Sequence, residues 1–138
     1  MSRSKTRVVP TILIVLLSCI SSPAQTQAPI SRDACRAYQQ AEAGMNKVFT
    51  QILSEYRRKP AFIQKLRAAQ RSWLRFRDGH LDSLYPARNK ATEFGSVYAM
   101  CRCMVLGELT KQRTQQLEKW ITGLEEEDVC SGSIRIKR

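Results

Sequence analysis

Hydrophobic residues recur every three or four positions through three long stretches of the chain, which is the spacing of amphipathic helices. The first stretch follows a capping residue, Ser31 or Asp33, and ends before Pro60, because the residue preceding a proline avoids the helical region. The second stretch covers 61–84 and the third 96–124, with a loop expected between them. No stretch shows a period of two. The pattern therefore predicts an all-α domain, a small bundle of about three helices.

The apolar face of each predicted helix defines the expected core. In the first helix it consists of Tyr38, Ala41, Met45, Val48, Ile52 and Tyr56, with Phe49 and Leu53 beside them. In the second it consists of Phe62, Leu66, Ala69, Trp73, Phe76 and His80. In the third it consists of Val97, Met100 or Cys101, Met104, Val105, Leu109, Leu117, Trp120 or Ile121, and Leu124.

The first residues of the chain have the pattern of an export signal. Arg3, Lys5 and Arg7 precede the apolar run Val8–Leu17, and small polar residues follow. The apolar run has about 10 residues, whereas a membrane-spanning helix needs roughly 20. We therefore expect an exported protein that is periplasmic, secreted or lipid-anchored, and that has no transmembrane helix.

Two processing sites compete in this leader. Ser22-Pro23-Ala24 fits the rule for signal peptidase, which would remove 1–24, whereas Leu16-Leu17-Ser18-Cys19 resembles a bacterial lipobox, which would remove 1–18 and leave a lipid on Cys19. Beyond the leader we expect a tether over 25–32, a helical domain over 33–124 and a flexible tail over 125–138. In the tail, only Cys130 is expected to be fixed to the domain.

The charge of the exported part restricts its partners. Three of the 23 basic residues lie in the leader, and the remaining 20 against 12 acidic residues give a formal charge of +8. Such a surplus attracts anionic polymers, phosphate or lipid headgroups, although it also describes an ordinary solvated basic surface. Nucleic acid is an unsuitable partner for an exported domain, despite the basic run Arg57-Arg58-Lys59.

Four cysteines remain after the leader: Cys35, Cys101, Cys103 and Cys130. An even number in a small exported domain predicts two disulfides. Cys101 and Cys103 lie two apart on a predicted helix, about 200° around its axis, so they should not bond to each other. Each should pair with Cys35 or Cys130, or one pair forms and two thiols remain. Zinc is disfavoured, because the chain has one histidine and no C-x-x-C.

No catalytic constellation can be assembled from these residues, so we expect neither an enzyme nor a cofactor. His80, the single histidine, lies near the apolar face of the second helix, where a half-buried structural role is expected. The acidic run 125–128 lacks the alternating ligands and the glycine of a calcium loop.

One polar set among the apolar rows is more informative. Its members Leu66, Gln70, Trp73 and Arg77 share a face of the second helix, and Asp78 lies about 100° further round. Thr110 and Arg113 share a face of the third helix. We expect these seven residues to hold the two helices together, with an Arg113–Asp78 ion pair, because interior polar groups need partners.

These residues also resemble a known family. The run Leu-x-x-x-Gln-x-x-Trp-Leu-x-Phe-Arg-Asp, then Gly95-Ser96, then Leu-Thr-x-x-Arg-x-x-x-Leu, is similar to the lysozyme-inhibitor LprI-like N-terminal domain of small bacterial envelope proteins. Met45-Asn46-Lys47-Val48-Phe49 resembles its upstream element, and the likeness covers about 35–124. The resemblance implies a non-enzymatic helical protein that binds and blocks lysozyme.

The chain departs from the family in its cysteines. Relatives often carry a cysteine shortly after Arg-Asp, where this chain has His80-Leu81, and another near Val105. The family's disulfide pattern therefore does not transfer.

Charge favours a different partner. Animal lysozymes are usually basic, so a +8 domain would be repelled at long range unless an acidic patch compensates, for example Glu118 with 125–128. The alternative is a basic structural module that binds anionic envelope polymer and does not inhibit lysozyme.

Overall fold

The computed structural model describes residues 23–126 and 129–137, so the leader and Cys19 lie outside the described part of the chain. Within that part the fold is all-α, as predicted, and no β-strand is present. The helices are α1 (Pro23–Glu55), α2 (Pro60–Leu84), α3 (Lys90–Phe94) and α4 (Tyr98–Thr122).

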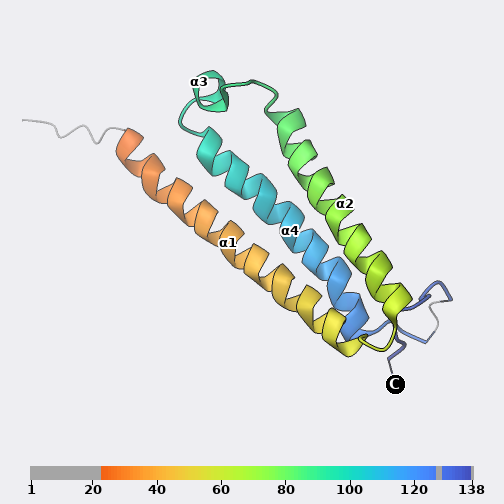
Figure 1. The fold of residues 1–138 in the computed structure, drawn as a ribbon. Coiled ribbons are helices and arrows are strands. Elements are labelled where there is room, and N and C mark those ends of the chain that lie inside the picture. Colours follow the sequence, from red (N-terminus) through yellow and green to blue (C-terminus); the bar gives the residue numbers. More distant parts are fainter. Residues whose placement is uncertain (1–22, 127–128, 138) are drawn as a thin grey trace, which may run out of the picture.

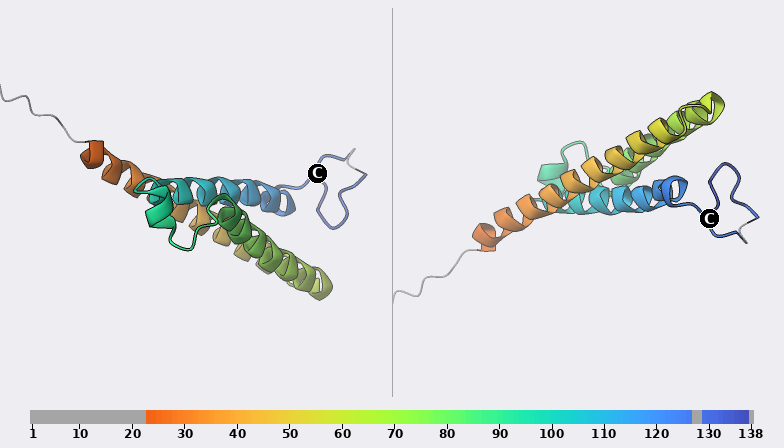
Figure 2. Two further views of the ribbon diagram at one scale, coloured as in Figure 1. Left: turned by 90° about the horizontal axis from the view of Figure 1, so that it is seen from above. Right: turned by 90° about the horizontal axis from the view of Figure 1, so that it is seen from below.

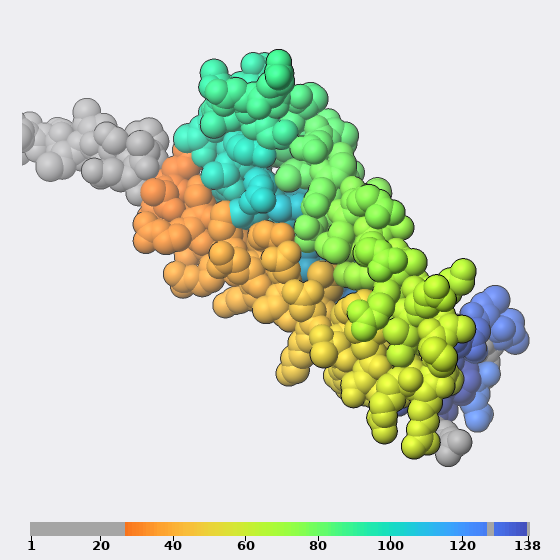
Figure 3. Space-filling model, in the orientation of Figure 1, coloured from red at the N-terminus to blue at the C-terminus, as the bar shows by residue number. Residues whose placement is uncertain are grey.

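The three long helices form an elongated bundle in which α4 lies between α1 and α2 (Figure 1). The start of α1, the short α3 and the start of α4 lie at one end. The α1–α2 turn and the C-terminal segment lie at the other end, where they form separate corners (Figure 2). The space-filling view shows α4 as a strip between α1 and α2 in the half of the molecule near α3 (Figure 3).

The hydrophobic core lies in the half of the bundle nearer the α1–α2 turn, where all three long helices contribute. Its buried members are Met45, Ile52, Tyr56, Leu66 and Leu117. Partly buried residues pack against them: Val48, Phe49, Leu53, Phe62, Trp73, Trp120 and Ile121. Six of the first-helix positions expected in the core thus lie in it or against it, whereas Tyr38 and Ala41 are half-buried outside it.

On the other two long helices, part of the apolar row expected in the core is exposed to solvent. Phe76 and Met104 were expected in the core, but each is 58% exposed. The buried face of α2 consists of Leu66, Gln70, Arg77 and Leu81. The buried face of α4 consists of Cys103, Leu106, Gly107, Thr110 and Leu117. Burial therefore follows a row that contains polar residues, and the most apolar row on each helix lies to one side of it.

A disulfide joins α1 to α4, as the cysteine spacing allows. It links Cys35 to Cys103 across 68 residues, with the two Cα atoms 4.8 Å apart. Cys101 and Cys103 are not bonded to each other, which confirms that prediction, and Cys101 is a half-buried thiol. The expected second disulfide is not present among the described residues, and Cys130 is exposed.

Helix α1 begins earlier than expected, and this corrects the prediction of a tether over 25–32. The helix starts at Pro23 and contains Pro29, which in the sequence resembles a helix break. The early turns have a tertiary contact, because the hydroxyl of Ser96 donates a hydrogen bond to Gln27 at 3.4 Å. The expected loop before the third helix likewise contains α3, which is capped by the side chain of Asn89.

The C-terminal segment folds back onto the end of α4, although a flexible tail was expected. The backbone of Leu124 exchanges hydrogen bonds with Arg135 and Lys137 at 2.9 and 2.8 Å. Gly123, with φ 83°, makes this return possible, because a Cβ there would lie 3.0 Å from the carbonyl oxygen of Arg135. Arg135 also forms an ion pair with Glu55 at the end of α1.

Candidate functional site

The polar residues that sequence reasoning selected on α2 lie on the side of that helix facing α1 and α4, and they form what we term the polar seam. Leu66, Gln70 and Arg77 are buried, at 5%, 7% and 7% exposure, and Trp73 is half-buried between them. From α4, Thr110 is fully buried and Arg113 half-buried.

Gln70 connects all three long helices. Its side-chain carbonyl accepts a hydrogen bond of 3.0 Å from Arg113 Nε of α4, and its amide nitrogen donates to Met45 Sδ of α1 at 3.4 Å. Both polar atoms of this buried amide are hydrogen-bonded, and moving the side chain would leave buried partners unpaired at a cost in unfolding free energy. Gln70 is therefore a structural residue.

The expected Arg113–Asp78 ion pair is wrong. Asp78 is exposed and pairs instead with its neighbour Arg77 at 2.9 Å, while Arg113 donates to the amides of Gln70 and Gln116. The reason is geometric: Asp78 lies at the edge of the buried face of α2, within reach of the Arg77 side chain on the same helix.

The two arginines of the seam differ in their electrostatics. Burial alone would lower the pKa of Arg77, but its hydrogen bonds and ion pairs with Asp78 and Glu42 raise it. Burial lowers the pKa of Arg113, whose hydrogen-bond partners are uncharged amides. Both guanidinium groups approach the ring of Trp73, at 5.5 and 6.0 Å from its centre. The amide and guanidinium groups of the seam are thus paired, whereas the fully buried hydroxyl of Thr110 has no hydrogen-bond partner among the described residues.

An apolar groove opens beside the seam, between the later half of α2 and the first half of α4. It has a volume of about 350 Å³ and is lined by His80, Leu84, Met104, Val105, Glu108 and Leu109. His80 is half-buried, as expected, and stacks on the exposed Phe76 with ring centres 5.9 Å apart. His80 of α2 and Val105 of α4 line this groove from opposite sides. Sequence reasoning missed this groove because it placed Phe76 and Met104 in the core.

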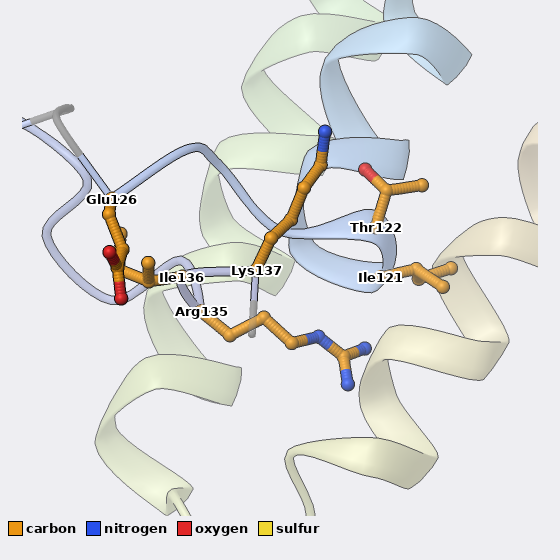
Figure 4. Close-up of a pocket in the computed structure, with 6 residues that line it drawn as sticks. All are labelled: Ile121, Thr122, Glu126, Arg135, Ile136 and Lys137. Carbon is orange, nitrogen blue, oxygen red and sulfur yellow. The ribbon is translucent and has the colours of Figure 1, made fainter.

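A larger hollow, about 840 Å³, lies between the end of α4 and the C-terminal segment (Figure 4). Its lining residues are Ile121, Thr122, Glu126, Arg135, Ile136 and Lys137. The side chains of Arg135 and Lys137 extend in different directions in Figure 4, and each forms an ion pair, with Glu55 and Glu125 respectively. These ion pairs offset the positive charges of Arg135 and Lys137.

The acidic patch expected to offset the basic surface is also partly neutralised. Glu125 is bound by Lys137, Glu118 and Glu126 are exposed, and 127–128 lie outside the described residues. Among the described residues, no cluster of His, Cys, Asp or Glu has the arrangement of a metal site. Within the same part of the chain, no helix is long and apolar enough to cross a membrane.

Comparison with known proteins gives one match. The family model described as lysozyme inhibitor LprI matches residues 19–117, which include the disulfide and the whole polar seam. Searches of the curated proteins and of the solved structures find no significant match.

Proposed function

Because the chain belongs to the lysozyme inhibitor LprI family, we propose that it is a non-catalytic binding protein of the bacterial envelope that inhibits lysozyme. One observation supports the transfer of the family's function to this chain: residues that resemble the family pattern form two hydrogen-bonded groups that meet at the ring of Trp73. Gln70 bridges Arg113 and Met45, and Arg77 bridges Asp78 and Glu42. These two groups join α2 to both α1 and α4, which supports a preserved framework in this chain.

The proposed mechanism is steric. A disulfide-linked bundle with a supported interior presents its surface with little loss of conformational entropy on binding, which favours affinity. Inhibition then requires only that the bound domain covers the path of the polysaccharide substrate.

Export completes the proposal. The basic, apolar and small-residue order of the leader supports removal of at least residues 1–18, with Cys19 lipidated or the chain cut before Gln25. The intact mass of the envelope-purified protein separates these forms. A start at Cys19 with added acyl mass identifies the lipoprotein, and a full-length mass contradicts export.

The direct test is lysis of bacterial cell wall by a basic animal lysozyme in the presence of the exported domain. We expect lysis to slow in proportion to the domain added, and to do so at both low and physiological salt. A short-range complex is screened little by salt, whereas the long-range repulsion between two basic proteins weakens as salt rises. Unchanged lysis at all concentrations contradicts the proposed function.

The second candidate function rests on the formal charge of +8 beyond the leader. A basic module that coats anionic envelope polymer would bind peptidoglycan or an acidic polymer directly, and this binding would fall steeply between low and physiological salt. Cosedimentation of the domain with cell-wall polymer, at the same two salt concentrations, distinguishes it from the inhibitor.

A further inference from the structure

The α1–α2 turn carries a concentrated positive charge that the polar seam does not use. Arg57, Arg58 and Lys59 follow one another there, and all three are exposed. None of them forms an ion pair within the described part of the chain. We call these three residues the basic turn.

Local compensation is weak around the basic turn. Glu55, the acidic residue nearest in sequence, already pairs with Arg135 and accepts a hydrogen bond from Gln51. The first turn of α2 contains no acidic residue. Arg57 donates a hydrogen bond of 3.4 Å to the carbonyl oxygen of Ser54, and the ammonium group of Lys59 lies 5.2 Å from the centre of the Tyr56 ring, but neither contact supplies a negative charge. Among the described residues, the positive charge of these three exposed side chains therefore remains uncompensated at the α1–α2 turn, one corner of the elongated molecule (Figure 2).

The backbone of the basic turn is fixed by contacts with the core. Tyr56 is buried, its hydroxyl donates to the carbonyl oxygen of Trp120 at 3.0 Å, and its ring packs 4.7 Å from that of Phe62. The amide of Lys59 donates to the carbonyl oxygen of Tyr56 at 2.8 Å, and Pro60 fixes the next backbone angle. A narrow corner on such a base can enter a cleft at little entropic cost.

Lysozyme has one region that must carry negative charge whatever its overall charge. Hydrolysis of a glycosidic bond uses a pair of carboxylic residues that flank the scissile bond, so the substrate cleft contains at least one carboxylate. This chemistry explains how a +8 domain can bind a basic enzyme: the contact is made where the enzyme is locally acidic.

We propose that the basic turn, Arg57 to Lys59, enters the substrate cleft of lysozyme and places its cationic side chains near the catalytic carboxylates. The proposal rests on the proposed function and specifies its binding surface. It implies competition with substrate, because the turn and the polysaccharide occupy the same cleft. The rival surface is the apolar groove lined by Met104 and His80, together with the exposed ring of Phe76 that stacks on His80.

The test compares three variants of the exported domain as inhibitors of a basic animal lysozyme. The first removes the basic turn, through Arg57→Gln, Arg58→Gln and Lys59→Gln. The matched control removes three exposed arginines from α1 and α4, through Arg32→Gln, Arg36→Gln and Arg102→Gln, so that both variants lose the same charge. The third changes the groove, through Phe76→Ala and Met104→Ala.

We expect the inhibition constant to rise about 30-fold for the turn variant and less than about threefold for the other two, since lost charge pairs in a desolvated contact are costly. An N-acetylglucosamine trimer, which occupies the cleft, should displace the wild-type domain. Thermal unfolding by circular dichroism verifies the fold of each variant, and the single Arg58→Gln variant provides a milder change that should weaken inhibition severalfold.

Three results would overturn the proposal while leaving the proposed function intact: a turn variant that inhibits like wild type, equal losses in the turn and control variants, or a loss confined to the groove variant. Failure of the trimer to compete would also overturn it. A wild-type domain that does not inhibit lysozyme at all refutes the proposed function itself, so the two failures are distinguishable.

Discussion

Helix α4 contacts its two long neighbours by different means. Against α1 it has a covalent bond, Cys35–Cys103, and a close backbone approach, since Gly107 would place a Cβ 3.5 Å from Cα of Tyr38. Against α2 it has the hydrogen bond between Arg113 and Gln70, and beyond that an open groove of about 350 Å³. The α1–α4 contact is covalent and brings the backbones close together, whereas the α2–α4 contact depends on side-chain hydrogen bonds; a groove of similar size, about 330 Å³ and 350 Å³, opens beside each.

This difference identifies the part of the molecule that holds the others in place. The α1–α4 pair forms the frame, and α2 is added to it through the core near Leu66 and through the polar seam. The groove is the place where the α2–α4 seam ends. Changes to the α1–α4 pair should therefore cost more than changes of similar size to α2.

Loss of the disulfide should have the largest effect. The double variant Cys35→Ala and Cys103→Ala should lose about 4 kcal/mol of unfolding free energy, because the bond closes a loop of 68 residues in the unfolded chain. Denaturant unfolding followed by circular dichroism measures the change. The Cys101→Ala variant, which removes a half-buried thiol, serves as the control and should lose less than about 1 kcal/mol. A double variant as stable as this control would contradict the covalent frame.

Removal of the Trp73 ring should have the next largest effect. Trp73→Ala should cost about 3 kcal/mol, since the ring packs against the core and lies beside the guanidinium groups of Arg77 and Arg113. Phe76→Ala, three residues further along the same helix, should cost less than about 1 kcal/mol because its ring is 58% exposed. Thermal unfolding of both variants compares the two faces of α2. Equal losses would show that the phase of α2 described above is wrong.

The helices could be predicted from the sequence because apolar spacing encodes them, but apolar spacing alone did not give their buried faces. The most apolar rows of α2 and α4 pass through Phe76 and Met104, which are exposed. The structure buries Gln70, Arg77 and Thr110, which their residue types had placed between the helices. Hydrophobicity alone misses such a face, because its burial depends on hydrogen bonds between helices such as that of Arg113 with Gln70.

The candidate site shows the same division. Residue types alone indicated a polar network between the helices, and the structure brings Gln70, Trp73, Arg77 and Arg113 together there. The partner of each charge was not predictable, because Asp78 could reach Arg77 or Arg113 from its position on the helix edge. The packing of the C-terminal segment against α1 was not predictable either, because it depends on the contact of Arg135 with Glu55, 80 residues away in the sequence.

The polar seam predicts a moderate cost for Arg113. Arg113→Ala should lose about 1.5 kcal/mol, because it leaves the buried carbonyl of Gln70 without its donor. Asp78→Ala should lose less than about 0.5 kcal/mol, since its exposed pair with Arg77 lies in water and Arg77 keeps Glu42. Denaturant unfolding of the two single variants measures both. A large loss for Asp78 would revive the ion pair expected from the sequence.

The smallest effect should be a gain of stability at the α1–α4 contact. Gly107→Ala should stabilise the protein by about 0.5 kcal/mol, because alanine favours a helix over glycine and its methyl group meets Tyr38 at ordinary contact distances of 3.5 and 3.6 Å. Gly44→Ala in α1 is the matched control, since a Cβ there has no neighbour within 4 Å, and it should gain about 1 kcal/mol from helix propensity alone. Thermal unfolding gives both shifts. If Gly107→Ala instead loses more than about 1 kcal/mol, α1 and α4 pack more closely than these distances indicate, and the contrast between the α1–α4 and α2–α4 contacts is greater than described.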